Sequence, residues 1–256
     1  MIEELLRAAA QPDKNVHNRA VRELAERGQQ DPSVREQVVA ALGAREARVR
    51  MAAARALEPL QGAPCEPLAP LVDDPDASVR WAATKTIAWG LHEPQPAVVA
   101  PLLVAACDDV WTVRRWALWG LGKCPGAEPA AAVAAALRDP DPLVRRHAAF
   151  ASRSVPDLLR ALDDPHGGVR WAAANALGRL RAREAVGPLS RRLRRRDRSV
   201  RWAAARALGE IGGPEARAGL GALAARVENP SFRRNVESIL RHAPRRPTSA
   251  GRWHRA

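Results

Sequence analysis

The sequence contains no tyrosine and only two phenylalanines, and β-branched residues are sparse beside its many alanines. β-strands favour aromatic and β-branched side chains, so this shortage argues against a mainly β protein. Alanine has the highest helix propensity, and its short side chain lets helices pack closely. The composition therefore predicts an all-α fold in a chain of 256 residues, a length that suits one or two domains.

Other absences narrow the location and the chemistry. No apolar run reaches the roughly 18 residues that a membrane-spanning helix needs. The N-terminus, Met1-Ile2-Glu3-Glu4, is acidic and lacks a secretory hydrophobic segment, so a cytoplasmic location is expected. The three cysteines, Cys65, Cys107 and Cys124, exclude a disulfide framework and form no Cys-x-x-Cys pair that would indicate structural zinc.

Acidic residues are scarce at one end of the chain. The formal net charge is +13, from 41 basic and 28 acidic residues. Residues 181–256 hold 19 of the basic and only 6 of the acidic residues, so the whole excess lies there. This asymmetry indicates an anionic partner near the C-terminal end. The segment contains a basic cluster that we expect to bind anions, made of Arg191, Arg192, Arg194, Arg195, Arg196 and Arg198.

A short phrase of valine, arginine and an alanine-rich helix recurs along the chain, with a period of about 31 residues. Its first residue, called the anchor below, occurs at positions 16, 49, 79, 113, 144, 169, 200 and 232. Each period predicts a shorter helix A, an Asp/Pro-rich turn, and a helix B that begins just before the anchor. No single pair can bury its apolar face, so the repeats predict an α-solenoid stabilised by stacking of neighbours.

Local signals mark the ends of the B helices. Residues three places before the anchor are predicted N-caps, namely Asp13, Asp76, Asp141 and Asp197, with Asn229 and Glu46 in the weaker copies. Gly90, Gly122, Gly178 and Gly209 are predicted to end B helices in the left-handed conformation. The step from Val144 to Val169 is shorter than the others, which predicts a tighter turn or a local change of curvature there.

The phrase resembles the HEAT-like repeats first associated with phycobilin lyases, and the copy from Val200 to Gly209 matches it closely. The resemblance implies an all-α, right-handed α-solenoid of about eight helix pairs, one domain over residues 1–240, whose B helices line the concave surface. The remainder, 241–256, has no acidic residue and is predicted to be a basic disordered tail. Such repeats occur in scaffolds, lyases, hydroxylases and DNA-repair proteins, so the resemblance is highly specific for fold and poorly specific for function.

The side of helix B away from the core carries cations and aromatics at positions +2 and +6 from the anchor. The stretches 79–91, 113–122, 144–153, 169–181 and 200–209 contain no acidic residue. We therefore expect a partner-binding concave surface formed by Trp81, Lys85, Arg115, Trp119, Arg146, Trp171, Trp202, Arg206 and Arg234. The alternative is that these tryptophans pack along neighbouring helices and stack on arginine. Trp89, Trp111, Trp116 and Trp119 crowd together and are expected to be part core and part groove.

Position +1 carries arginine in seven of the eight copies. A structural ladder is expected, in which each arginine pairs with a turn aspartate of its own or the next repeat, because a guanidinium can hold several acceptors. Its members are Arg50, Arg80, Arg114, Arg145, Arg170, Arg201 and Arg233.

No catalytic residue, metal ligand or cofactor is predicted. HEAT-like deoxyhypusine hydroxylases surround two irons with several His-Glu pairs, and the single pair here, His92-Glu93, cannot build that site. HEAT-like alkylpurine DNA glycosylases use tryptophan, arginine and a carboxylate in a concave groove, and the central B helices offer no carboxylate. No phosphate-binding glycine loop or Ser-His-Asp set is present.

Two functional hypotheses follow. The first is a non-catalytic scaffold whose cationic, tryptophan-bearing concave surface holds an acidic protein segment. The alternative is a nucleic-acid-binding protein, with or without glycosylase-like repair activity, whose C-terminal end contacts phosphates. A bilin-lyase-like chaperone is a lesser alternative that rests on the repeat resemblance alone.

Overall fold

The computed structural model describes residues 1–58, 65–90, 96–193 and 197–245. Within these ranges the chain forms α- and 3-10 helices joined by turns, without a β-strand, which confirms the predicted all-α fold. Each of the eight anchors lies inside a separate B helix, which confirms the repeat period. The B helices are α2 (Lys14–Gln30), α4 (Ala47–Ala56), α5 (Ala77–Gly90), α7 (Trp111–Leu121), α9 (Pro142–Ala151), α11 (Gly167–Arg179), α13 (Arg198–Ile211) and α15 (Pro230–His242).

The A elements that precede them are mostly shorter, and several include 3-10 turns. One reason is proline: Pro70 lies inside η2 and cannot donate the backbone hydrogen bond that an α-helix needs. The A elements are α1 (Ile2–Ala9), α3 (Pro32–Ala40) with η1 (Ala41–Gly43), η2 (Glu66–Asp73), η3 (Pro96–Val98) with α6 (Val99–Ala105), α8 (Ala127–Ala136), α10 (Val155–Ala161), η4 (Arg183–Ala185) with α12 (Val186–Arg192), and α14 (Pro214–Arg226).

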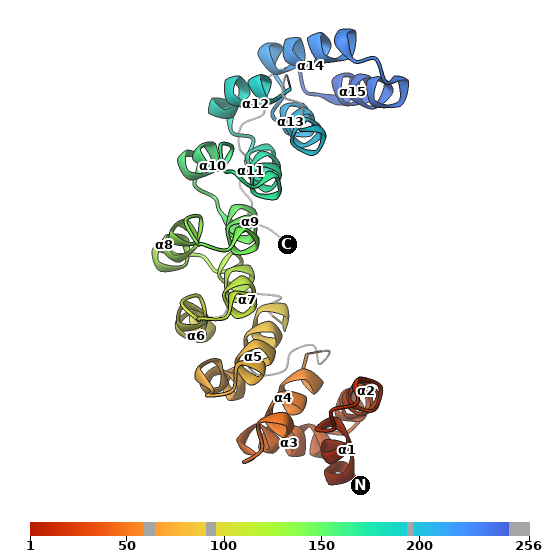
Figure 1. Ribbon diagram of the computed structural model, residues 1–256, viewed down its shortest axis with the longest axis vertical. Coiled ribbons are helices and arrows are strands. Elements are labelled where there is room, and N and C mark those ends of the chain that lie inside the picture. The colour runs from red at the N-terminus through yellow and green to blue at the C-terminus, as the bar shows by residue number, and fades with distance from the viewer. Residues whose placement is uncertain (59–64, 91–95, 194–196, 246–256) are drawn as a thin grey trace. The chain divides into compact units, whose positions relative to one another are not determined.

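The chain divides into two compact units, Met1–Ala132 and the residues from Val133 onward. In the first unit, α2, α4, α5 and α7 pack in sequence, each against the next. In the second, α9, α11, α13 and α15 do the same, and α10 and α12 lie along the other side of α11 and α13 (Figure 1). Each unit is thus a stack of helix pairs in which contacts are made between neighbours.

Alanine forms much of the interface between successive B helices. In the second unit, Ala172, Ala173 and Ala174 of α11 share one hydrophobic core with Ala203, Ala204 and Ala205 of α13, and all are completely buried. Leucines from the A elements, among them Leu158 and Leu189, complete this core. Short side chains let the backbones approach, so the alanine-rich composition that predicted helices also determines how they stack.

The predicted N-caps are confirmed in five of the six cases. Asp13, Asp141, Asp197 and Asn229 each accept a backbone N–H from the first turn of their B helix, and Asp76 accepts from the amide of Ser78. Glu46 makes no such bond. Its longer side chain does not suit the short return to the backbone that Asp and Asn make.

Two of the four predicted glycines do end a B helix, since Gly90 is the last residue of α5 and Gly122 is the C-cap of α7. The predicted left-handed conformation is wrong, because none of the four has a positive φ, and Gly178 and Gly209 lie within their helices. The role of Gly178 and Gly209 is close packing: a Cβ on Gly209 would lie 2.3 Å from Cγ2 of Ile239. The C-cap of α13 is Gly212, with φ +70°, where a Cβ would lie 2.7 Å from the carbonyl oxygen of Pro244.

The short step between Val144 and Val169 coincides with short helices, since α9 has 10 residues and α10 has 7, whereas α11 has 13 and α13 has 14. Three residues join α9 to α10, as many as join α11 to η4, and two join α13 to α14. The amide of Ser152 donates to the carbonyl of Ala148, and Ser154 caps α10. The connection is therefore no tighter than others in the chain, and a local change of curvature stays a prediction.

The start of the basic tail differs from the sequence-based expectation. α15 continues to His242, Ala243 is buried, and the carbonyl of Pro244 accepts a hydrogen bond from the amide of Gly213. Arg217 donates to the carbonyls of Leu240 and Ala243. Residues 241–244 thus belong to the last repeat, because these backbone contacts hold them against it. Residues 246–256 lie outside the described residues.

Candidate functional site

Ion pairs join Arg50, Arg80, Arg145 and Arg170 to an aspartate of the following repeat's turn. The pairs are Arg50–Asp74 at 2.8 Å, Arg80–Asp108 at 2.6 Å, Arg145–Asp164 at 2.8 Å and Arg170–Asp197 at 2.6 Å. Both side chains of each pair are partly or largely buried. We call this set of contacts the arginine ladder.

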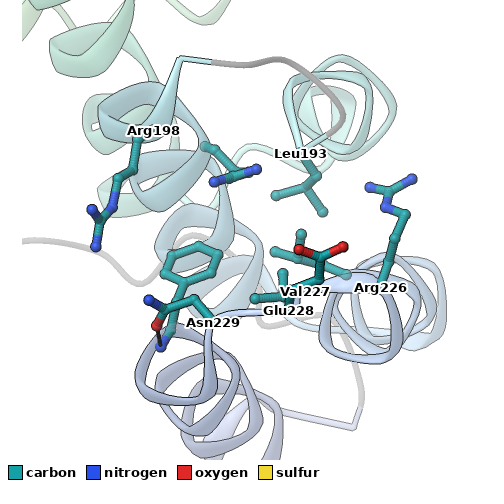
Figure 2. A pocket seen from close by; sticks show the side chains of 9 residues that line it. Leu193, Arg198, Arg226, Val227, Glu228 and Asn229 are labelled. Atoms are coloured by element: carbon teal, nitrogen blue, oxygen red, sulfur yellow. Dashed lines mark hydrogen bonds between the residues drawn. The ribbon is translucent and has the colours of Figure 1, made fainter.

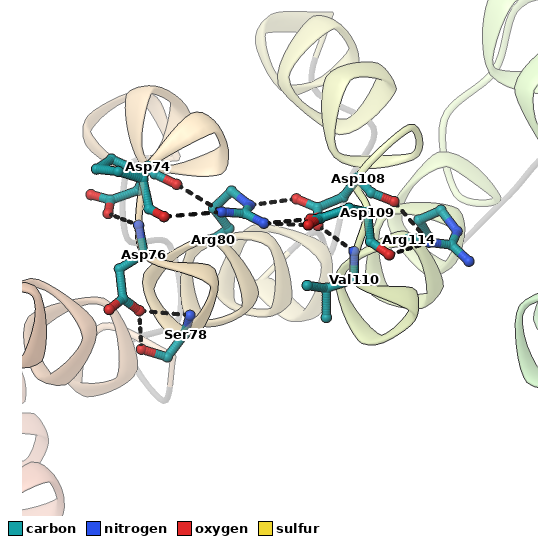
Figure 3. A network of polar contacts seen from close by, with 9 residues as sticks. Asp74, Asp76, Ser78, Arg80, Asp108, Asp109, Val110 and Arg114 are labelled. Carbon is teal, nitrogen blue, oxygen red and sulfur yellow. Dashed lines mark hydrogen bonds and ion pairs between the residues drawn. The ribbon is translucent and has the colours of Figure 1, made fainter.

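The ladder has a regular geometry, shown for Arg80 in Figure 3. Its Nε donates to Oδ2 of Asp108 at 2.6 Å and its Nη2 to Oδ1 at 3.2 Å, so the carboxylate is held at two points. Its Nη1 donates at 3.1 Å to the carbonyl of Asp74, in the turn that precedes its own helix. One guanidinium therefore ties two successive turns together, as the fork-shaped donor set allows.

These contacts set the pKa of the aspartates. Burial raises the pKa of Asp74, but hydrogen bonds from Arg50 and from the amide of Asp76 outweigh it and hold the pKa below its usual value. Asp108, Asp164 and Asp197 show the same balance and the same direction. The carboxylates are thus stabilised as anions by the native fold.

Further contacts are made by Arg114, Arg201 and Arg233. Arg114 donates to the carbonyls of Asp108 and Asp109, and Arg233 donates twice to the carbonyl of Val227. Arg201 stacks over the ring of Phe232 at 5.2 Å, and its buried Nε has no hydrogen-bond partner among the described residues. In three rungs of the ladder, those of Arg50, Arg80 and Arg145, Nε is the atom that donates to the aspartate.

In the first unit, aromatic and cationic side chains of α5, of α7 and of Lys123, which follows α7, make ring contacts with one another. We call this set of side chains the α5–α7 aromatic surface, and it consists of Trp81, Lys85, Trp89, Arg115, Trp116, Trp119 and Lys123. Trp89 and Trp116 meet edge to face at 6.2 Å. Trp89 remains 54% exposed and Trp119 42% exposed, which places two large apolar side chains in solvent. Trp111 and Trp116 are half-buried, and a groove at this cluster stays a prediction.

Cations lie over the rings of this surface. Lys85 Nζ is 5.3 Å from the ring centre of Trp81 and 5.8 Å from that of Trp116. Arg115 lies 5.2 Å from Trp116, and Lys123 lies 5.6 Å from Trp119. Burial lowers the pKa of Lys123, whose ammonium donates to the carbonyl of Ala88. Such cation–π contacts fix the positions of the indoles.

In the second unit, the predicted tryptophans are packed rather than bare. Trp171 meets Phe150 edge to face at 5.3 Å, and Trp202 lies 5.8 Å from Phe232. Both tryptophans are half-buried against the core. Of the predicted cations in this unit, Arg206 and Arg234 are exposed and Arg146 is half-buried.

Of the five B helices that were expected to lack acidic residues, α13 contains one. α13 continues past Gly209 to Ile211 and so includes Glu210, whose carboxylate lies 3.6 Å from Arg206. Burial raises the pKa of Glu210, opposed by the charges of Arg206, Arg179 and Arg181. In the first unit, Glu58, which follows α4, pairs with Lys85 at 2.8 Å. Both acids stand just beyond the stretches that the sequence periodicity delimited, and so were missed.

The basic cluster is described in part. Arg191 and Arg198 are exposed, whereas Arg192 forms an ion pair with Asp163. Arg194, Arg195 and Arg196 lie outside the described residues, as does the His92-Glu93 pair. Within the described ranges, no group of three or more His, Cys, Asp or Glu side chains is arranged to hold a metal ion. No helix there is long and apolar enough to cross a membrane.

The stacked helix pairs and the ladder define a helical-repeat protein. The chain belongs to the HEAT-repeat family, since a family model for HEAT repeats matches residues 2–88, 65–153 and 155–241. No curated protein sequence matches it.

Two solved structures share this fold. Escherichia coli YibA is 20% identical, with a TM-score of 0.70 over 93% of this chain and 92% of that one. An engineered protein is 21% identical, with a TM-score of 0.58 over 94% of this chain and 77% of that one. At these identities the likeness concerns the fold alone.

Proposed function

We propose that this HEAT-repeat protein is a binding scaffold that holds an acidic protein segment on its α5–α7 aromatic surface. The observation that carries the proposal is the exposure of Trp89 and Trp119 beside fixed cations. A tryptophan has on the order of 150–250 Å² of surface, so two that are about half exposed present a substantial apolar area. Apolar area of this kind marks interaction sites when it is contiguous and rimmed by polar groups.

The charge of the surface favours an acidic partner. Lys85, Arg115 and Lys123 place three cationic side chains beside the indoles, and Glu58 pairs with Lys85. The indoles offer apolar contact, and the cations beside them offer ion pairs to carboxylates of a bound segment. Tryptophan and arginine are the residue types that contribute most to protein interfaces. Arg146, Arg206 and Arg234 on the B helices of the second unit are further candidate contacts in the same proposal.

The experiment is fluorescence anisotropy with a short fluorescein-labelled peptide of glutamate and leucine. The double variant Trp89→Ala/Trp119→Ala should weaken binding at least about tenfold, because it removes both exposed indoles. Val104→Ala is the matched control, since Val104 is also an exposed apolar residue but lies on helix A α6. Equal affinity for the double variant and the native protein would refute the proposal.

A second candidate is nucleic-acid binding at the C-terminal end. It is favoured by the excess of 13 positive charges in residues 181–256 and by the exposure of Arg181, Arg191 and Arg198. A labelled oligonucleotide titrated at several salt concentrations tests it. Duplex binding should give a slope of log K against log salt of about −0.9 for each neutralised phosphate. The packing of Trp171 and Trp202 against phenylalanines disfavours base stacking on them. A link to the phycobilin-lyase group rests only on the repeat phrase.

A further inference from the structure

A cavity of about 550 Å³ lies in the second unit, at the turn between α14 and α15. Leu193, Leu223, Val227 and Phe232 give it apolar walls, and Asn229 borders it. Three arginines line it: Arg198 and Arg201 from α13, and Arg226 from the end of α14. In Figure 2, Arg198 and Arg226 stand on opposite sides, with Val227 and Glu228 between them.

The cavity lies where a rung of the arginine ladder would be expected. The aspartates of three rungs, Asp74, Asp108 and Asp164, stand five residues before the anchor of their repeat. The same position in the last repeat, five before Phe232, is Val227. The fourth rung uses Asp197, three before its anchor, and the matching residue here is the neutral Asn229. Neither position supplies a carboxylate to Arg201.

The consequence is an arginine without its acid. Nε of Arg201 is buried without a hydrogen-bond partner among the described residues, whereas Arg50, Arg80 and Arg145 each donate from Nε to a carboxylate. Leaving a buried donor unsatisfied is costly, so an acceptor that enters the cavity would be favoured. The other groups that line the cavity add two cations and one anion, Glu228, which forms no ion pair within the described part of the chain.

We propose that this cavity binds a carboxylate group supplied from outside the chain, which completes the missing rung at Arg201. The planar guanidinium holds a carboxylate at two points in the rungs of Arg50, Arg80 and Arg145, and the apolar walls accommodate the short carbon chain that carries it. The source is either an acidic side chain of a bound protein segment or a small free dicarboxylate. The site shares no residue with the α5–α7 aromatic surface, so either proposal can fail alone.

Isothermal titration calorimetry tests the proposal with three titrants: succinate, acetyl-Glu-Glu-amide and inorganic phosphate. We expect at least one carboxylate to bind and Arg201→Lys to weaken it at least about tenfold, because a lysine cannot form the two-point contact. Arg170→Lys is the matched control, since its rung is already filled by Asp197, and it should leave the affinity unchanged. Whichever of succinate and acetyl-Glu-Glu-amide binds more tightly identifies the source of the carboxylate, a free dicarboxylate or an acidic side chain. Phosphate bound as tightly as either, with the same dependence on Arg201, would overturn the assignment to carboxylate.

Two further variants supply the acid within the chain. Val227→Asp and Asn229→Asp each place a carboxylate where one kind of native rung has it, and Asp serves as an N-cap as well as Asn does. Each variant should abolish binding of the external carboxylate and raise the melting temperature. If the Val227→Asp protein fails to fold, the Asn229→Asp protein still tests the proposal. Unchanged carboxylate affinity in a folded Asn229→Asp protein, or no binding of either carboxylate by the native protein, would overturn the proposal.

Discussion

Arg80 on α5 donates from Nε to Oδ2 of Asp108 at 2.6 Å, and so joins one helix pair to the turn of the next. The Asp108 side chain is only 5% exposed, whereas Asp109, which also pairs with Arg80, is 83% exposed. The two neighbouring acids therefore bind the same guanidinium from very different environments. That difference allows the contribution of burial to the strength of the ion pair to be measured.

Asp108→Asn should destabilise the fold, because it removes a charge-assisted two-point contact and leaves the partly buried Arg80 with the exposed Asp109 as its ion-pair partner. The expected loss in free energy of unfolding is about 1.5–3 kcal/mol. Asp109→Asn is the control and should cost less than about 1 kcal/mol, as exposed ion pairs do. Urea denaturation followed by circular dichroism measures both. Equal losses for the two variants would show that the buried rung has no special role.

Acid should weaken the protein within a defined pH window. The folded-state pKa values of Asp74, Asp108, Asp164 and Asp197 are lowered from 3.8. A lowered carboxyl pKa gives stability that is fully present above the unfolded pKa and is lost as pH falls through the folded pKa. The free energy of unfolding should therefore hold between pH 7 and about pH 5 and decline below about pH 4. Asp108→Asn should show a shallower decline, and a loss of stability already complete at pH 5 would contradict this assignment.

The sequence alone predicted the repeat, its eight B helices and most of their N-caps, because a fixed period and a short capping side chain act locally. It did not predict the role of Gly178 or Gly209, since that depends on how closely the next helix approaches. Glu210 and Glu58 were missed because each lies just beyond the phrase that defines the B helix. The half-burial of Trp171 and Trp202 depends on Phe150 and Phe232 in neighbouring repeats. Helical periodicity predicts the face of the helix on which a side chain lies, but it does not predict how close the side chains of the next repeat come.

Gly178→Ala should destabilise the second unit although alanine is the better helix former. A Cβ there would lie 2.8 Å from Cα of Ala207, a backbone atom that cannot move aside, and 2.6 Å from Oε2 of Glu210. Overpacking of this kind costs about 1–3 kcal/mol. Gly221→Ala on α14 is the matched control, because nothing lies within 4 Å of its Cβ position. That substitution should stabilise the protein by about 0.5–1 kcal/mol. Two stabilising results in thermal denaturation would show that α11 and α13 are not in such close contact.

Trp202→Ala and Trp89→Ala should separate structural tryptophans from those available to a partner. Trp202 packs against the core of the second unit and lies 5.8 Å from Phe232, so its removal leaves a void and should cost about 2–4 kcal/mol in free energy of unfolding. Trp89 is 54% exposed and meets Trp116 edge to face, so its loss should cost less than about 1.5 kcal/mol. Chemical denaturation gives both values, and the acidic-peptide assay should respond in the opposite order. If the Trp202→Ala protein is as stable as the native protein but cannot bind the peptide, Trp202 belongs to the recognition surface and not to the core.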